Sequence, residues 1–261
     1  MNIFALSECP IQSASYAADK HIVKMPLESV QLLSTAWRTA AGIDTPVIMP
    51  NGSTSWINLL EGEEYYIEVR YKCRCLLGDK YITWNDRMPY GVDPLVERAA
   101  DIEKWYKEGY TEINFDVWKY QAQYVWDTKR ALSATHANHP SNVWTRSGAA
   151  QYNWLMIHAY ALEAEWKSRY GHSADRRHKS VQLLDNFPSG EDLFEVTEFT
   201  LPTPAMPDHY KVYDASGSID VVKSYRTYYL YDKAEMGLPM NLWRPIRKGI
   251  VDAYVGTSQV A

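Results

Sequence analysis

The feature that most constrains the fold is the stretch from Asp19 to Trp37, in which hydrophobic residues recur every three or four positions, the spacing of one helix face. Pro26 lies inside this pattern, where a proline removes a backbone hydrogen bond and crowds the preceding turn. We therefore expect a helix that begins at Pro10 or Ser13, is kinked or broken at Pro26 and ends before Gly42. Its buried side is predicted to comprise Ile22, Val23, Leu27, Val30, Leu33 and Trp37.

Most of the remaining chain also shows helical spacing or helix-boundary signals. Asp93-Pro94 is typical of a helix start, because Asp caps a first turn and Pro is tolerated there. The fold class is therefore predicted as mainly α: a single irregular helical domain over 1–261, with long Pro-rich loops and at most a few short strands. Further helices are predicted over 57–77, 94–107, 113–134, 148–170 (capped by Ser147, ended by Gly171), 176–186, 218–235 and after Pro245, with loops at 43–56, 134–144 and 187–217.

Composition and charge weigh against several classes of protein. The net charge of −5 and the pI near 5.8 disfavour a general binder of duplex DNA. No apolar run approaches the about 20 residues of a membrane helix, and MNIFALSECPIQ lacks the features of a signal peptide. We therefore expect a soluble, intracellular protein.

Cysteine and aromatic usage give two further indications. Cys9, Cys73 and Cys75 suit neither a disulfide framework nor a four-ligand zinc site, so Cys-x-Cys is read as two thiols on a helix or strand. The chain holds 20 Tyr and 10 Trp against 5 Phe. Tyr and Trp suit interfaces and base-stacking surfaces, although a core with Tyr-rich edges is the simpler explanation.

A polar stripe shares one face of the first long helix. It consists of His21, Lys24, Glu28, Gln31 and Thr35. Because His titrates near neutral pH and a Lys beside another cation can become nucleophilic, the predicted catalytic residues are His21 as base, Glu28 as its partner, and Lys24. Lys20 and Gln31 are predicted to bind substrate. The alternative is the solvated side of a surface helix.

The stretch HANHPSNVWTR is a second candidate. His136 and His139 could share a metal, but Pro140 disfavours the helix that such spacing needs, and no metal is assigned. With Asn142, Trp144 and Arg146, they form a recognition set of imidazoles, an amide, a stacking ring and a cation. The alternative is a loop whose Asn and His side chains cap neighbouring helices.

The stretch RYGHSADRRHKS is locally basic in an acidic chain. Arg169, Arg176, His178 and Lys179 are predicted to bind phosphate, helped by backbone amides at a helix start. A solvated turn is the alternative. No Walker loop, nucleophile elbow, zinc-protease motif or dinucleotide-binding fingerprint occurs, which removes most hydrolase, kinase and dehydrogenase classes.

Taken in order, the blocks MNIF, DKHIVKMPLESVQLLSTA, HPSNVWTRSGAAQYNWL and RYGHSADRRHKS, followed by Met206-Pro207 and Tyr210, resemble an uncharacterised protein family of tailed bacteriophages. The region 51–132 resembles it less, and Pro26 departs from its pattern. The resemblance implies a phage origin and the cytoplasm of the infected bacterial host, but no reaction.

The predicted function is that of an enzyme acting on a nucleotide or nucleic-acid base, because a stacking ring, amides and a basic patch suit a nucleotide. The alternative is a non-enzymatic protein that binds nucleic acid or a host protein through a Tyr- and Trp-rich surface. The expected partner is a nucleotide or single-stranded nucleic acid, with no membrane; the cofactor is left unassigned. The stripe around His21 is expected to share a concave surface with the loop from His136 to Arg146.

Overall fold

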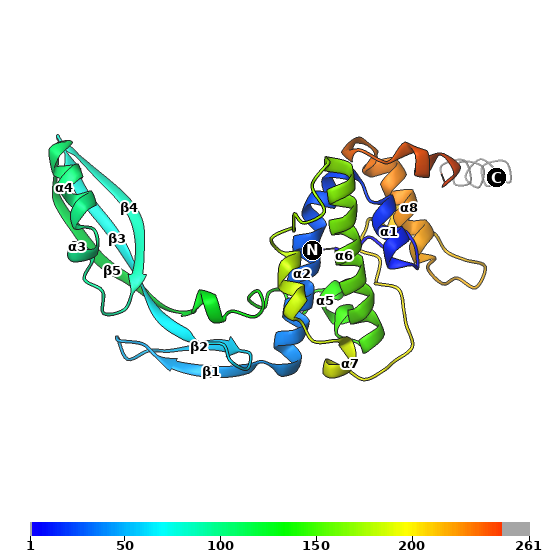
Figure 1. Cartoon of the computed structure of the whole chain (residues 1–261), viewed down its shortest axis with the longest axis horizontal. Coiled ribbons are helices and arrows are strands. Elements are labelled where there is room, and N and C mark those ends of the chain that lie inside the picture. The colour runs from blue at the N-terminus through cyan, green and yellow to red at the C-terminus, as the bar shows by residue number, and fades with distance from the viewer. Residues whose placement is uncertain (1, 247–261) are drawn as a thin grey trace. The chain divides into compact units, whose positions relative to one another are not determined.

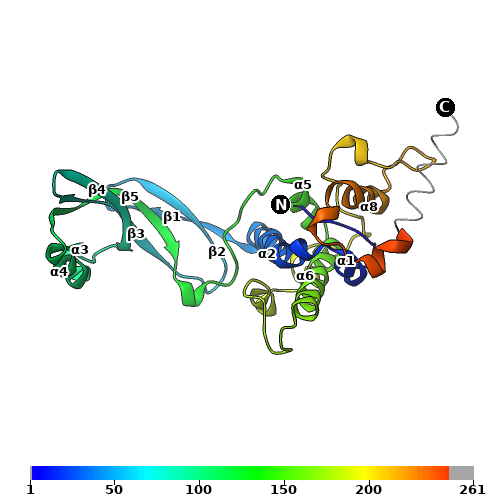
Figure 2. The same ribbon diagram turned by 90° about the horizontal axis from the view of Figure 1, so that it is seen from above.

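The computed structural model describes residues 2–246, and its chain divides into two compact units. The residues up to Ala41 and those from Arg130 onward form one, which we call the helical unit. Residues 42–129 form the other, the sheet unit. Figures 1 and 2 show the strands gathered in the sheet unit and the long helices in the other. The sheet unit is therefore an insertion in the sequence of the helical unit.

The helical unit is built on α2 (Asp19–Ala41) and α6 (Ala149–Tyr170), which pack against each other, while α1 (Pro10–Tyr16) also packs on α6. Residues 240–246 are helical as well. The remaining elements are α5 (Pro140–Thr145), α7 (Gly190–Leu193), α8 (Val221–Asp232) and 3₁₀ turns at Val181–Asn186, Asp208–Tyr210 and Ala234–Met236.

Aromatic residues with polar ends fill much of the helical unit's core. The indole of Trp243 is fully buried, and its Nε1 donates to the carbonyl of Tyr16 at 2.8 Å. Trp154 donates in the same way to the carbonyl of Glu8 at 2.6 Å. Each ring thus contributes apolar area while its N–H remains satisfied. For these residues, the Tyr and Trp enrichment serves the core.

The sheet unit contains two antiparallel sheets, one of two strands and one of three in the order β4-β3-β5. Two short helices, α3 (Pro94–Glu97) and α4 (Ala99–Lys107), lie between β4 and β5 in the sequence, and a 3₁₀ turn, Trp126–Thr128, follows β5. The strands are β1 (Ile43–Ile48), β2 (Thr54–Leu59), β3 (Tyr65–Leu77), β4 (Lys80–Pro89) and β5 (Tyr110–Tyr124).

The predicted mainly α fold class is wrong, because the chain mixes helices with two sheets. The predicted helices 57–77 and 113–134 are largely strands, and the predicted loop 43–56 holds β1 and the start of β2. The cause is visible in the letters VRYKCRC of β3, where buried Val69, Tyr71 and Cys73 alternate with charged residues. A period of two is that of a half-buried strand.

Several predicted helix boundaries are confirmed. The carboxylate of Asp93 accepts a backbone N–H of the first turn of α3 at 2.9 Å. Gly171 ends α6 in the left-handed region, with φ of 63°. Ser147 does not cap α6, however, because its hydroxyl donates to the carbonyl of Trp144 and Gly148 takes the cap position.

Other boundaries differ from the prediction. The expected helix from Pro10 or Ser13 to Ala41 is two helices, α1 and α2, and α2 continues through buried Pro26 without a break. The predicted loop 134–144 contains α5, which begins at Pro140. Only a 3₁₀ turn forms within 176–186, and 187–217 is mostly irregular, as predicted. The helix expected after Pro245 lies mostly outside the described residues.

Candidate functional site

His21 is buried in the helical unit, at 7% exposed. Its ring stacks on Phe4 with centroids 4.5 Å apart, and its Nδ1 shares a 2.5 Å hydrogen bond with the hydroxyl of Tyr229. Burial, and then the charge of Lys233, lower the pKa of His21 to about 4, while Glu28 opposes this shift. The imidazole is therefore neutral at pH 7 and packed among aromatic rings, so proton exchange with a substrate would require this core to open.

Lys24 and Glu28 form an ion pair one helical turn apart, with 2.8 Å between Nζ and Oε1. The Glu28 side chain is only 13% exposed, whereas that of Lys24 is 71% exposed. The second carboxylate oxygen accepts the backbone N–H of Asn2 at 3.2 Å. Glu28 is thus an oriented, largely enclosed carboxylate. Along the same helix, Lys20 is exposed and Gln31 is half-buried.

The segment 131–135 is fixed to the second half of α2. The hydroxyl of Thr35 accepts the N–H of Thr135 at 3.1 Å and lies 3.3 Å from its carbonyl oxygen. Arg38, at 1% exposed, donates to the first two carbonyls of the segment at 2.8 and 2.6 Å. The polar stripe of α2 and the loop that carries the histidines therefore meet at Thr35.

His139 and Asn142 organise the start of α5. Nδ1 of His139 accepts the N–H of Ser141 at 3.2 Å, which makes this histidine a helix cap. The fully buried Asn142 donates from Nδ2 to the carbonyls of Thr135 and His136 at 3.0 and 2.9 Å, and His136 has φ of 49°. Oδ1 of Asn142 has no hydrogen-bond partner in the described part of the chain.

The pKa of His139 is lower than that of an exposed histidine. Burial is the main cause that lowers the pKa of His139; the charge of His136 also lowers it, and the carboxylate of Glu28 raises it. The loop that carries His139 is bonded to α2 at Thr35, two helical turns after Glu28. We call Lys24, Glu28, His136 and His139 the Glu28–His139 cluster; it combines predicted residues from both blocks.

The other members of the predicted recognition set are engaged within the protein. Trp144 is 5% exposed, and its Nε1 donates to the carbonyl of Thr200 at 2.8 Å. Arg146 donates to the carbonyl of Ala137 at 2.5 Å. Trp144 therefore serves the core, and its ring offers no open face for stacking.

The predicted phosphate site is largely neutralised by carboxylates. Arg169 lies 2.9 Å from both Asp19 and Glu165, and its side chain is 16% exposed. It also donates to the carbonyls of Ser15 and Ala17 at 2.7 Å. This arginine therefore ties α6 to the junction between α1 and α2.

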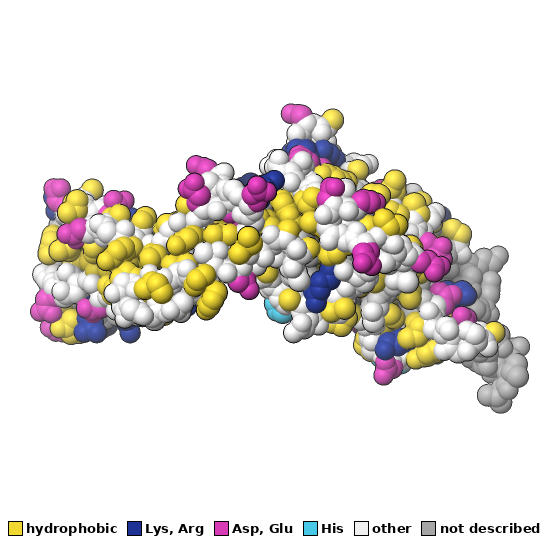
Figure 3. Space-filling view, turned by 90° about the horizontal axis from the view of Figure 1, so that it is seen from below, with side chains coloured by type: hydrophobic (Ala, Val, Ile, Leu, Met, Phe, Trp, Pro, Cys, Tyr) yellow, Lys and Arg dark blue, Asp and Glu magenta, His cyan; other side chains and the backbone are white. Residues whose placement is uncertain are grey.

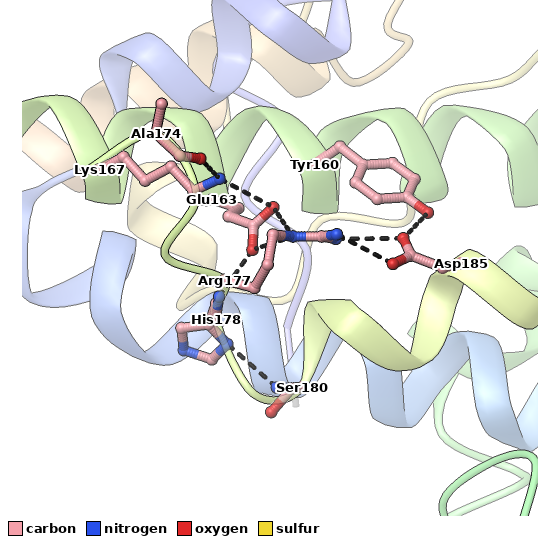
Figure 4. A network of polar contacts seen from close by, with 8 residues as sticks. All are labelled: Tyr160, Glu163, Lys167, Ala174, Arg177, His178, Ser180 and Asp185. Atoms are coloured by element: carbon pink, nitrogen blue, oxygen red, sulfur yellow. Dashed lines mark hydrogen bonds and ion pairs between the residues drawn. The ribbon is translucent and has the colours of Figure 1, made fainter. Parts of the chain in front are cut away.

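A second ion-pair network occupies the following turn (Figure 4). Nε of Arg177 donates to buried Glu163 at 3.0 Å, and Nη1 donates to Asp185 at 2.9 Å. The backbone N–H of His178 donates to Glu163 at 2.7 Å. The hydrogen bonds of Arg177 to Asp185 and Glu163 raise its pKa, so this guanidinium stays charged.

Two predicted phosphate-binding cations keep an exposed charge. The guanidinium of Arg176 lies 5.3 Å from the ring centre of Trp166 and donates to His172 at 3.0 Å. Lys179 is exposed. Neither has a carboxylate partner within residues 2–246, so any phosphate contact in this region falls to these two residues.

Within residues 2–246, no group of three His, Cys, Asp or Glu side chains could hold a metal ion. Cys73 and Cys75 are buried in β3, and burial raises the pKa of the Cys73 thiol to about 12. A protonated thiol is a poor metal ligand. Among the described helices, none is long and apolar enough to cross a membrane.

Three residues that shape this region were missed from the sequence: Asn2, Arg38 and Tyr229. Arg38 had a usable signal, because it lies three residues after Thr35 and so continues the polar stripe on the same helix face. Tyr229 had none, because its contact with His21 joins residues 208 positions apart.

Comparisons with protein-family models, curated proteins and solved structures found no match to this chain.

Proposed function

We propose that this chain is an enzyme acting on a nucleotide or nucleic-acid base, with Glu28 as general base and His139 as a second proton-transfer group. The carrying observation is the enclosed carboxylate of Glu28, oriented by Lys24 and Asn2, on the helix to which the loop of His139 is bonded at Thr35. A carboxylate held close to a neutral imidazole can take a proton from one substrate atom while the imidazole relays another.

The other predicted residues take supporting roles in this proposal. His21 is a positioning residue, because its ring packs beneath the same helix face and contacts Tyr229. The exposed charges of Lys20, Arg176 and Lys179 would attract phosphate to the helical unit. The resemblance to tailed-phage proteins supports an action inside the infected bacterial host.

The test is to incubate the protein with nucleotides and with oligonucleotides containing each base, and to follow product masses. The wild type is expected to change at least one substrate, and Glu28→Gln to lower that rate by about 100-fold or more. His139→Asn preserves the helix cap but removes the imidazole, so it should lose rate without losing stability.

The matched control is Glu108→Gln, which alters another Lys–Glu pair of the same order and spacing. It should leave the rate unchanged. The proposal would be contradicted if the wild type converted none of the substrates, or if wild type and Glu28→Gln had equal rates.

Exposed aromatic residues favour a second candidate, an interaction protein without chemistry. Trp56 is 65% exposed and Trp126 is 80% exposed. Figure 3 shows hydrophobic side chains running along one side of the sheet unit. Recovery of a defined host protein with the wild type but not with Trp56→Ala, together with a silent substrate panel, would favour this candidate.

A further inference from the structure

The three-stranded sheet presents two chemically different faces. On β3, Val69, Tyr71, Cys73 and Cys75 are buried, whereas Lys72 and Arg74 between them are exposed. This follows from the alternation of side chains along a strand. One face is therefore a core face, and the opposite face is polar.

Helices cover the core face. Trp84 of β4 lies opposite Cys73, and its ring meets that of Trp105 in α4 with centroids 5.1 Å apart. Arg98, between α3 and α4, lies 2.7 Å from Asp86 of the same strand. Both contacts hold the helices on the core side and leave the polar side open to solvent.

A row of three cations crosses the polar side. Arg70 of β3 is directly opposite Arg87 of β4 and Lys119 of β5, so all three side chains leave the sheet on one face. The carboxylate of Glu68 lies 3.0 Å from Arg70 and 3.9 Å from Arg87. Lys119 has no carboxylate partner within the described residues. We use the name open face for the polar side of this sheet, which carries Arg70, Lys72, Arg74, Asn85, Arg87 and Lys119.

The acidic residues of the sheet unit are concentrated elsewhere. Residues 42–129 contain 15 Asp and Glu against 10 Lys and Arg, so the unit as a whole is acidic. Five of those carboxylates belong to the helical segment that covers the core face: Asp93, Glu97, Asp101, Glu103 and Glu108. On the open face, Glu68 lies between Arg70 and Arg87, Asp116 is opposite Lys72, and Glu112 accepts the hydroxyl of Tyr81 beside Arg74. Asp86 lines the same groove as Arg70 and Arg87. The charge is therefore distributed unevenly between the two sides.

Two neighbouring grooves on this side combine cations with exposed indoles. One, of about 260 Å³, is lined by Arg70, Asn85, Asp86, Arg87 and Trp118. The other, of about 380 Å³, shares Arg87 and includes Gln123, Trp126 and Lys129. Trp118 is 52% exposed and Trp126 is 80% exposed, so both rings are open to contact.

We propose that the open face binds single-stranded nucleic acid, with the cation row on its phosphates and Trp118 and Trp126 stacked on its bases. Arginine and lysine neutralise a phosphate backbone, and an exposed indole stacks on any base. The amides of Asn85 and Gln123 lie beside the two rings and can reach base edges. Combined with the function proposed above, this surface makes single-stranded nucleic acid the substrate. Only this statement about the substrate rests on the proposed function; the binding itself does not.

A single strand fits better than a duplex or an acidic peptide. Stacking on an indole requires an unpaired base, which a duplex does not offer. An acidic peptide would use the cations but leave both indoles without a flat partner. The acidic remainder of the unit also repels a long duplex.

The experiment measures binding of a fluorescent 15-nucleotide single strand to the full chain by anisotropy, over a range of salt. Arg87→Gln combined with Lys119→Gln is expected to weaken binding by about 10-fold. It should also reduce the slope of log affinity against log salt concentration by about 1.4, the value for the loss of two phosphate contacts on a single strand. Trp126→Ala is expected to weaken it by about 5-fold or more.

The matched control is Lys104→Gln with Lys107→Gln, the same charge change on α4, and it should alter affinity less than twofold. Circular dichroism checks that each variant is folded. Absence of wild-type binding at low salt, equal losses in the control, or equal binding of a duplex or a poly-glutamate peptide would each overturn the proposal. Glu28→Gln should bind normally, so failure of catalysis and failure of this surface are told apart.

Discussion

His21 and His158 are two imidazoles that the helical unit keeps uncharged. His158 is 5% exposed and bonds to the carbonyl of Pro10 at 2.9 Å. Burial lowers the pKa of each to about 4, against 6.5 for an exposed histidine. Between these values the unfolded chain binds more protons than the folded one, so stability is full above pH 6.5 and falls as the pH drops toward 4.

At pH 5 this linkage is expected to cost about 2 kcal/mol for each histidine relative to pH 7.5. Urea unfolding at the two pH values measures it. His21→Gln should remove one histidine's share of the difference. Histidine resonances that titrate between pH 6 and 7 at both positions would contradict the burial that causes the effect.

Thiol reactivity should separate the three cysteines. Cys9 is exposed, whereas Cys73 and Cys75 are buried and burial raises the pKa of both. Because the thiolate is the reacting species, alkylation of the native protein at pH 8 should modify Cys9 alone, and alkylation in urea all three. Mass spectrometry of peptides gives the count. Labelling of Cys73 as fast as Cys9 would show that β3 opens readily.

At the scale of elements, Arg177 ties the 3₁₀ turn after residue 180 to α6 through Glu163 and Asp185. Arg177→Ala leaves the carboxylate of Glu163, 7% exposed, without its main partner. The free energy of unfolding should fall by about 3 kcal/mol. Arg176→Ala, one position earlier, loses only exposed contacts and should cost under about 1 kcal/mol. Equal effects in denaturant titrations would contradict this assignment.

Elements whose sequence signals are local could be predicted, and elements that depend on distant contacts could not. Asp93 and Gly171 act locally, through a cap and a left-handed residue, and both were found. The strand β3 was missed because its Lys and Arg residues also suit a helix and its two-residue period was not counted. The α2 stripe placed His21 and Glu28 on one helix face, but no local pattern could show that His21 turns inward to Tyr229.

At the scale of the whole molecule, the sheet unit is continuous in sequence while the helical unit is interrupted. The two ends of the interruption are close in the helical unit, because Arg38 bonds to residues 131 and 132 and Arg130 lies over Trp37. A chain in which a short Gly/Ser linker replaces 43–129 should therefore keep its helices and unfold cooperatively. The isolated fragment 42–129 should show a β spectrum by circular dichroism. A shortened chain without a cooperative transition would contradict the division.

The same interruption sets an order of events during synthesis. Helices α1 and α2 find their partner α6 only after more than a hundred further residues have been made. The strands of the sheet unit, by contrast, pair with neighbours along the chain, which closes shorter loops. Nascent chains stalled just after residue 129 has left the ribosome should protect the sheet unit from protease while 1–41 is still cut. The apolar side of α2 therefore stays without its partner α6 while more than a hundred further residues are made, and this helix near the start of the chain is among the last to be sheltered.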